Sequence, residues 1–279
     1  MHRSATRSYS DAMLIAQISD CHVAEPGARF AERTDSADGL RRAVETIARL
    51  PITPDLVLLT GDLVDDGTSA QYDRLLDLLG GLDAPLLPLP GNHDDRQQLR
   101  SRFAATLGTG DADDPIDVVY DVGPMRIIAL DTTIPGRHDG DLTDGQLAWL
   151  DEQLGLAPER PTIVAQHHPP TSSGIVWMDA NCGFAAGDRE ADVLRRHRHV
   201  EAVVSGHLHR SLQRRYAGTV SITCPSTAGA LALALAGGPV EYTAEPSGFL
   251  LHHWRDGVGL VTHLVPVGQY ESWSPSWAT

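Results

Sequence analysis

Five short apolar runs constrain the fold of this chain more than any other feature of its sequence. Each run is continuous in apolar character and ends at a polar residue, which is typical of strands buried on both faces in a parallel or mixed sheet. The runs occupy residues 13–19, 56–60, 85–90, 162–166 and 200–205. Stretches with helical spacing follow the first two runs, at 36–50 and 72–82. The order strand, helix, strand, helix predicts an α/β domain.

Helix starts and turn residues organise the rest of the chain. Capping-box patterns at Thr68-x-x-Gln71 and Thr143-x-x-Gln146 predict two helix N-termini. After residue 206 the apolar runs shorten and alternate with turn residues, which indicates antiparallel hairpins of a second sheet or an extension at the edge of the first. The chain has no internal repeat and no linker rich in Gly and Ser. We therefore expect a single domain over 1–279 with a β-rich C-terminal extension from about residue 210.

The composition excludes several classes of function. The net charge of −15 and the pI near 5.1 disfavour binding to a nucleic-acid polymer. All 22 basic residues are Arg, so no lysine can form a Schiff base or act as a general base, and the GC-rich Arg codons favour a high-GC bacterial source. No apolar stretch reaches the roughly 18 residues of a membrane span. An odd number of cysteines without CxxC spacing, and the lack of a signal-peptide pattern, predict a cytoplasmic protein with reduced thiols.

Polar residues with metal-binding side chains follow all five apolar runs. Ligands of open α/β sheets bind outside the carboxyl ends of the strands, so we expect these residues to meet at one edge. They are Asp20, His22, Asp62, Asn92, His93, His167, His207 and His209. Imidazole, carboxylate and amide oxygen suit Mn, Fe, Co or Zn. Seven of these eight groups already exceed the needs of one ion, whereas two ions that share a bridging carboxylate use all seven. A pair of divalent ions predicts phosphoester hydrolysis.

The motifs around these residues resemble the signature of the calcineurin-like metallophosphoesterases. In order and spacing they are "DCH" at 20–22, "GDLVDDG" at 61–67, "GNHDD" at 91–95, "QHHPP" at 166–170 and "GHLH" at 206–209. The pattern is most similar to the bacterial class III cyclic nucleotide phosphodiesterases and glycerophosphodiesterases, and the resemblance extends over about residues 14–265. It implies a four-layer α-β-β-α sandwich, in which two mixed sheets pack face to face with helices outside.

The resemblance also implies roles for individual residues. The first metal ion would be held by Asp20, His22 and His209, and the second by Asn92, His167 and His207. Asp62 would bridge the two ions, and His93 would be the catalytic acid and a phosphate contact. Asn92 and His209 would contact substrate as well. The activity implied is that of a metal-dependent phosphoric diester hydrolase acting on a small phosphodiester, such as 3',5'-cyclic AMP, by metal-hydroxide attack.

Other candidate residues carry weaker signals. Segment 172–187 is expected to form a cap loop in which Trp177 and Asp179 contact substrate, with a packed loop as an equal alternative. His138 is a second candidate at the same edge, and His168 is expected to serve packing or to hydrogen-bond a group that supports a ligand. Asp94 and Asp95 are expected to form a charge pair at a helix N-terminus. The remaining histidines are expected to be ordinary surface or sheet residues: His197, His199, His252, His253 and His263.

Several alternatives stay open at this point. The same site would serve a glycerophosphodiesterase or a phosphomonoesterase, although we expect a diester because an oxygen of a monoester dianion would take the place of the attacking hydroxide. A single-metal hydrolase and a non-catalytic binding module on the same fold are further alternatives; the second would lack ligands, and none is missing. The Ala/Leu stretch 230–236 is expected to be a buried strand or part of a contact in a homodimer.

Overall fold

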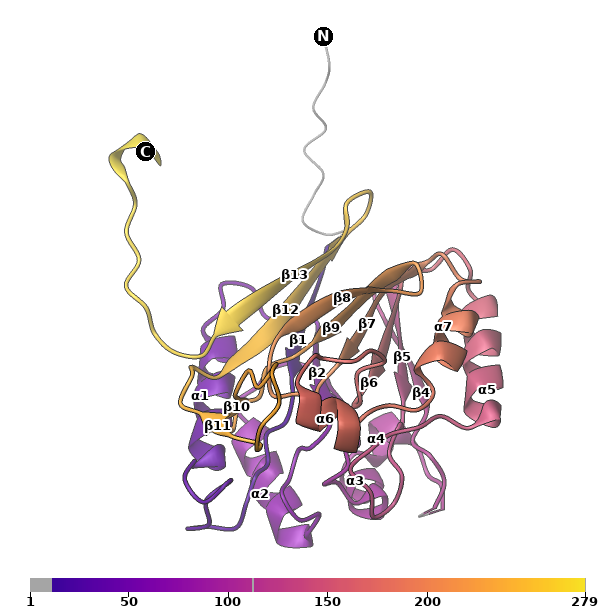
Figure 1. The fold of residues 1–279 in the computed structure, drawn as a ribbon. Coiled ribbons are helices and arrows are strands. Elements are labelled where there is room, and N and C mark those ends of the chain that lie inside the picture. Colours follow the sequence, from indigo (N-terminus) through magenta and orange to yellow (C-terminus); the bar gives the residue numbers. More distant parts are fainter. Residues whose placement is uncertain (1–11, 112, 279) are drawn as a thin grey trace.

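The computed structural model describes residues 12–111 and 113–278, and two mixed β-sheets form its centre (Figure 1). The strand order of the first sheet is β13 (Gly259–Pro266), β12 (Gly248–Arg255), β1 (Ala12–Ile18), β2 (Leu56–Thr60) and β3 (Leu86–Leu89). Strands β1, β2 and β3 are parallel, while β12 and β13 are antiparallel to their neighbours. The five predicted runs are all strands, and β1, β2 and β3 are the first three of them.

The second sheet contains the other two predicted strands at its centre. Its order is β4 (Val118–Val122), β5 (Met125–Leu130), β6 (Thr162–Gln166), β7 (Val200–Ser205), β9 (Thr219–Thr223) and β8 (Leu212–Tyr216). Strands β5, β6, β7 and β9 are parallel, and the two edge strands are antiparallel. The β4–β5 hairpin was not predicted, because its turn at Gly123-Pro124 lies inside one apolar region that carries no polar site residue.

Helices cover the outer face of each sheet and give the predicted four layers. The first sheet packs against α1 (Ser36–Ala48), α2 (Ser69–Leu79), α3 (Arg96–Arg102) and α4 (Ala104–Leu107). The second packs against α5 (Asp144–Gly155) and α7 (Gly187–Leu194). The side chains of β5 alternate between these cores: Ile127 and Ala129 face the first sheet, and Ile128 and Leu130 face the helices. The four-layer α-β-β-α sandwich is thus confirmed. No helix in the described residues is long and apolar enough to cross a membrane.

Of the two expectations for 230–236, the buried strand is wrong and the contact in a homodimer stays a prediction. Only Ala230–Leu231 forms a strand (β10), which pairs with β11 (Tyr242–Thr243). Tight backbone turns then carry the chain out of the ladder, and Leu233 and Leu235 are 61% and 58% exposed. The apolar composition of this stretch predicted burial, but only Leu231 is a buried member of a core cluster, and Ala234 packs against that cluster while partly buried.

Two predicted local motifs are only half correct. Thr143 and Gln146 form a complete capping box at α5, but at α2 only Thr68 caps the helix, because the side chain of Gln71 bonds to Asp66 instead. At α3, Asp95 is the N-cap as expected. Asp94 is not part of a charge pair at that terminus. Its carboxylate accepts hydrogen bonds from the backbone N–H groups of residues 63 and 91 and from the hydroxyl of residue 72, and so joins two loops that carry site residues.

A buried carboxyl lies beneath the carboxyl end of β6. Glu190 on α7 is fully buried, and burial raises the pKa of its carboxyl to about 8. The Tyr216 hydroxyl lies 2.6 Å from the carbonyl oxygen of Gly187 and 3.0 Å from Glu190 Oε2. Its single proton goes to the carbonyl, which can only accept, so the second contact needs a proton on Glu190. The remaining Glu190 oxygen is buried near the side chain of Gln166, but neither this oxygen nor Gln166 Oε1 has a partner in hydrogen-bond geometry among the described residues. The carboxyl is therefore expected to be neutral in the folded protein.

This neutral carboxyl predicts a specific pH dependence of stability. The folded pKa lies above the unfolded value of about 4.3, so the folded state holds a proton that the unfolded state releases. The contribution to stability is complete below the unfolded pKa and is lost as the pH rises toward 8. Glu190→Gln keeps the shape and a donor without titrating. We expect this variant to unfold at a higher temperature than the native protein at pH 8, with the difference vanishing toward pH 4.5. Equal melting temperatures across this range in calorimetry would show that Glu190 is not neutral.

Candidate metal centre

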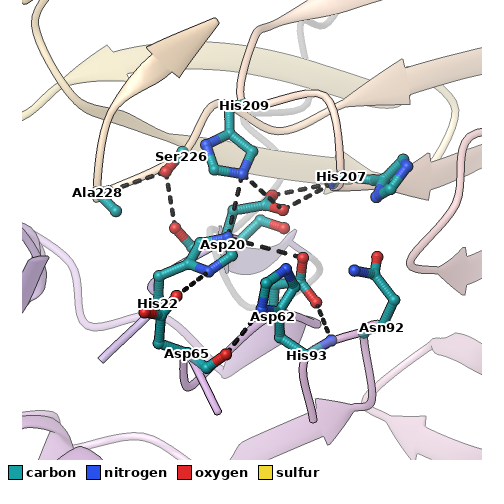
Figure 2. A network of polar contacts seen from close by, with 12 residues as sticks. Asp20, His22, Asp62, Asp65, Asn92, His93, His207, His209, Ser226 and Ala228 are labelled. Carbon is teal, nitrogen blue, oxygen red and sulfur yellow. Dashed lines mark hydrogen bonds and ion pairs between the residues drawn. The ribbon is translucent and has the colours of Figure 1, made fainter. Parts of the chain in front are cut away.

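The seven predicted ligands lie together at the carboxyl ends of β1, β2, β3, β6 and β7 (Figure 2). Each follows its strand within a few residues, so the parallel arrangement brings together side chains that are up to 189 positions apart in sequence. Figure 2 shows Asp62 between His22 on one side and Asn92 and His207 on the other. The sequence and the fold therefore place the whole set at one edge, between the two sheets.

One half of the set consists of Asp20, His22 and His209. Their ligand atoms lie within 4.8 Å of one another. His22 Nε2 is 3.2 Å from His209 Nε2, and His209 Nε2 is 3.6 Å from Asp20 Oδ1. All three side chains are buried, with at most 5% of any side chain exposed. This half corresponds to the first ion that the sequence resemblance implies.

The other half consists of Asn92, His167 and His207. His167 Nε2 lies 3.2 Å from Asn92 Oδ1 and 3.2 Å from His207 Nδ1. Asp62 joins the halves, since its Oδ2 is 3.7 Å from His22 Nε2 and 3.3 Å from His167 Nε2. A single carboxylate oxygen thus faces imidazoles from both halves.

The hydrogen bonds on the far side of each ring fix which nitrogen faces the centre. The Nδ1–H groups of His22, His167 and His209 donate to Asp65 Oδ1, to the Thr60 carbonyl and to the Gly229 carbonyl, respectively. In His207 it is Nε2–H that donates, to the Cys182 carbonyl at 2.9 Å. Partners of this kind hold the tautomer of histidines that bind metals.

In the first half this tautomer pattern makes two lone pairs face each other. His22 Nε2 and His209 Nε2 are both acceptors 3.2 Å apart, and two unprotonated nitrogens at this distance repel unless a positive charge lies between them. In the second half burial lowers the pKa of His167, but Asp62 and a second carboxylate outweigh it and raise this pKa to about 9, so Nε2–H donates toward Asp62 and His207 Nδ1. A cation would remove the repulsion in the first half and replace this proton in the second, and the donor set of imidazole, carboxylate and amide oxygen suits a borderline divalent metal. The residues therefore fit metal ions.

The electrostatics of the buried groups agree with this fit. Burial lowers the pKa of His22 and His209, and that of His207 to about 3, which keeps these rings neutral as ligands require. Burial also raises the pKa of Asp20 to about 7, and the neighbouring Asp62 carboxylate adds to the effect. Burial alone would raise the pKa of Asp62, but His167 outweighs it and holds this pKa well below its usual value. Two buried carboxylates this close favour bound positive charge.

The backbone at the centre is held in an uncommon conformation. Among the described residues, eight other than glycine have a positive φ, and five of them are ligands of this set: Asp20, His22, Asp62, His207 and His209, with φ between 43° and 71°. Such residues cost free energy and gather at functional sites. Close packing adds to the constraint, because a Cβ on Gly206 would meet Ser19 Oγ, Asp20 Oδ2 and the Thr60 carbonyl.

Two supporting residues were missed from the sequence. Asp65 orients His22 through its side chain and accepts from His93 Nδ1 through its carbonyl, at 2.7 Å. Ser226 donates to the Asp20 carbonyl at 2.7 Å and ties the left-handed turn at Asp20 to the second sheet. Asp65 lies inside the "GDLVDDG" motif, where its carboxylate was a visible signal. Ser226 follows β9 with no signal of its own.

His93 and His138 lie beside the Asn92 half. His93 Nδ1 donates to the Asp65 carbonyl, which leaves Nε2 for a substrate. Burial lowers the pKa of His93, but Asp62 and the Asp65 carbonyl outweigh it and the net shift is upward. His138 Nδ1 lies 3.2 Å from Asn92 Nδ2. When His138 Nδ1 accepts a hydrogen bond from that amide, Asn92 Oδ1 is turned toward His167. His138, a secondary candidate from the sequence, therefore contacts a ligand and orients it.

Segment 172–187 lies against the centre. It contains α6 (Val176–Asn181), which packs on Leu208, the residue between His207 and His209. Asp179 accepts hydrogen bonds from the backbone of residues 173 and 174 and thereby closes its own loop, while Trp177 is 40% exposed. Substrate contacts by Trp177 and Asp179 stay predictions. His168 packs against the rings of residues 167 and 207, and its two ring nitrogens contact Thr132 Oγ1 and the carbonyl oxygen of residue 138. His252, expected to be a surface or sheet residue, is fully buried in strand β12. Its ring nitrogens contact the side chains of Gln17 and Thr262.

Comparisons with known proteins agree with this geometry. Residues 13–211 match the model of a family described as calcineurin-like phosphoesterase. A probable glycerophosphodiester phosphodiesterase, GpdQ of Arcobacter nitrofigilis, is 32% identical over 260 residues, which cover 93% of this chain and 95% of that protein. The 3',5'-cyclic adenosine monophosphate phosphodiesterase CpdA of Pseudomonas aeruginosa is 35% identical over 229 residues, or 81% of each chain.

A solved structure shares the fold. A dimetal phosphatase from Danio rerio superposes with a TM-score of 0.65 at 19% identity, covering 92% of this chain and 99% of that one. At this identity the similarity concerns the arrangement of sheets and helices only.

The close packing around Asp20 predicts the effect of one added methyl group. Gly206→Ala forces Asp20 or Ser19 to move, so we expect fewer bound divalent ions per chain and a lower melting temperature. Gly155→Ala is the matched control, since a Cβ there meets nothing within 4 Å. Metal analysis by mass spectrometry after dialysis checks the prediction. Native metal content in the Gly206 variant would show that Asp20 is not held as described.

Proposed function

The chain belongs to the calcineurin-like phosphoesterase family, and on that premise we propose that it is a phosphodiesterase that uses two divalent metal ions to hydrolyse small phosphodiesters. One observation carries the proposal of two ions. A single oxygen of Asp62 faces His22 in one half of the centre and His167 in the other. Each half contributes three donor side chains of its own besides this shared carboxylate. A site for one ion would need no carboxylate in this position.

The residues take separate roles in the proposed reaction. Asp20, His22 and His209 hold one ion, Asn92, His167 and His207 hold the other, and Asp62 contributes to both. Divalent ions bound there would withdraw charge from the phosphoester oxygens and lower the pKa of a bound water. The protein's part is to hold seven donors in a buried, rigid arrangement, which left-handed turns and close glycine contacts fix before substrate arrives.

His93 is the residue placed to serve the leaving group. Its Nδ1 is bound to the Asp65 carbonyl, and its ring is edge-on to His22 at 4.7 Å. The ring therefore cannot turn freely, and the protonated imidazole presents Nε2–H beside the centre as a general acid. His138 supports the same side by orienting the amide of Asn92.

The proposed substrates are phosphodiesters, with 3',5'-cyclic nucleotides first and glycerophosphodiesters second. Two relatives carry these activities in their names. Their matches to this chain cover 81% and 95% of the relatives' own length. The protein carries a net charge of −15, so an anion is attracted only at the metal centre. A phosphomonoesterase on the same site is the alternative that a substrate panel decides.

The substrate panel gives the first test. We expect the metal-loaded protein to hydrolyse 3',5'-cyclic AMP, a glycerophosphodiester and an aryl diester with higher kcat/KM than the matching monoesters. The rates are measured by following the release of phosphate or nucleotide product by chromatography. Faster hydrolysis of monoesters than of every diester would replace the proposal with a phosphatase.

A variant of His93 gives the second test. We expect His93→Ala to keep its metal content and to lose roughly 100-fold or more in rate on diesters with alkoxide leaving groups, but much less on an aryl diester, whose leaving group needs no proton. His263→Ala, at an exposed position of β13, is the control. An equal loss on both substrates would assign His93 to positioning instead, and lost metal would make it structural.

A further inference from the structure

Tyr242 lies beside the His22 and His209 half of the metal centre and has no role in the functions described above. It belongs to β11, whose pairing with β10 forms a short hairpin beside α6 (Figure 1). Its ring packs edge to face on Phe30 at 5.1 Å and lies 5.6 Å from the His209 ring. The residue is 43% exposed, so the part not covered by these rings is accessible to a ligand.

Phe30 fixes the position of the Tyr242 ring. Phe30 is buried, lies 4.3 Å from His22 and stacks on His209 at 5.6 Å. The rings of His22, His209, Phe30 and Tyr242 therefore form one continuous aromatic cluster, with Tyr242 at its outer end. An aromatic pair of this kind restricts the ring at little cost in rotamer entropy.

The Tyr242 hydroxyl belongs to a ring that packs directly beside the His22 and His209 half of the centre. Burial raises the pKa of Tyr242 to about 12, and the carboxylates of Asp20, Asp62 and Asp65 contribute. The hydroxyl is therefore a neutral donor.

The hydroxyl has no hydrogen-bond partner in the part of the chain that the structure describes. The Tyr72 hydroxyl, by contrast, donates to Asp94, and the Tyr216 hydroxyl to the Gly187 carbonyl. Arg210, which follows His209, is paired with Glu245 at 2.8 Å. The Tyr242 hydroxyl is thus a neutral donor that this side of the centre offers to a phosphoester.

We propose that Tyr242 is a substrate-contacting residue whose hydroxyl donates a hydrogen bond to a non-bridging oxygen of the bound phosphoester. This proposal rests on the proposed function. The contact supplements the metal ions with a donor of fixed direction and adds no charge. A hydrogen bond to an anionic oxygen in a partly buried site contributes about 1.5–3 kcal/mol, which corresponds to about 10- to 100-fold in affinity or rate.

Two variants at this position separate the hydroxyl from the ring. Tyr242→Phe removes only the hydroxyl and keeps the packing on Phe30, whereas Tyr242→Ala removes both. We expect both variants to lower kcat/KM for 3',5'-cyclic AMP and for an aryl diester about 10- to 100-fold. Both should also weaken competitive inhibition by inorganic phosphate about tenfold, with native metal content and melting temperature for the Phe variant. Leu235→Ala, at an exposed position between the same two strands, is the control.

The possible outcomes distinguish failure of the Tyr242 contact from failure of the proposed phosphodiesterase function. A Phe variant within twofold of native on all three readouts overturns it; if the Ala variant then loses activity, the ring and not the hydroxyl makes the contact. Native protein that hydrolyses only monoesters refutes the diester function, yet the phosphate inhibition of the Phe variant still tests Tyr242. Native protein that neither turns over a phosphoester nor binds phosphate refutes both.

Discussion

The repulsion among buried ligand atoms is the interaction on which this structure depends. Four imidazoles and two carboxylates occupy one buried volume, in which the lone pairs of His22 Nε2 and His209 Nε2 face each other at 3.2 Å and the nearby carboxylates raise the pKa of His167. The protein tolerates this arrangement because each ring is anchored on its far side by a carbonyl or carboxylate, and because strained turns hold the backbone. Divalent cations are the partner that turns this repulsion into binding free energy, and the fold is organised around supplying their ligands.

The rest of the fold can be read as support for that arrangement. Parallel strands from both sheets end at the same edge, so ligands from distant parts of the sequence meet without long connections. Asp94 joins the loops after β2 and β3, and Ser226 joins the turn after β1 to the second sheet. Beneath them Gln17 bonds to Thr60 and to the Ser205 carbonyl, and so links strands of the two sheets just under the centre. Each link fixes one ligand loop relative to another.

The sequence predicted the central strands and the meeting of the candidate ligands at one sheet edge, because these depend on local signals. A buried parallel strand is continuously apolar, and a polar residue directly after it must lie at the sheet edge. Signals that depend on distant packing were not readable. Glu190 sits in a charged stretch typical of an exposed helix, but Tyr216 and Gln166 enclose it. Tyr242 follows a Gly-Pro turn with no motif, and only its contacts with Phe30 and His209 place it at the centre. For stretch 230–236, composition alone predicted burial, and turn geometry overrode it.

The central claim is that one carboxylate, Asp62, serves two ions. The most direct measurement is a crystal structure of the protein with Mn²⁺, recorded at a wavelength where manganese scatters anomalously. The account predicts two anomalous peaks per chain, one among Asp20, His22 and His209, one among Asn92, His167 and His207, and both in contact with Asp62. A single peak at saturating Mn²⁺, or a second peak with no contact to Asp62, would contradict it.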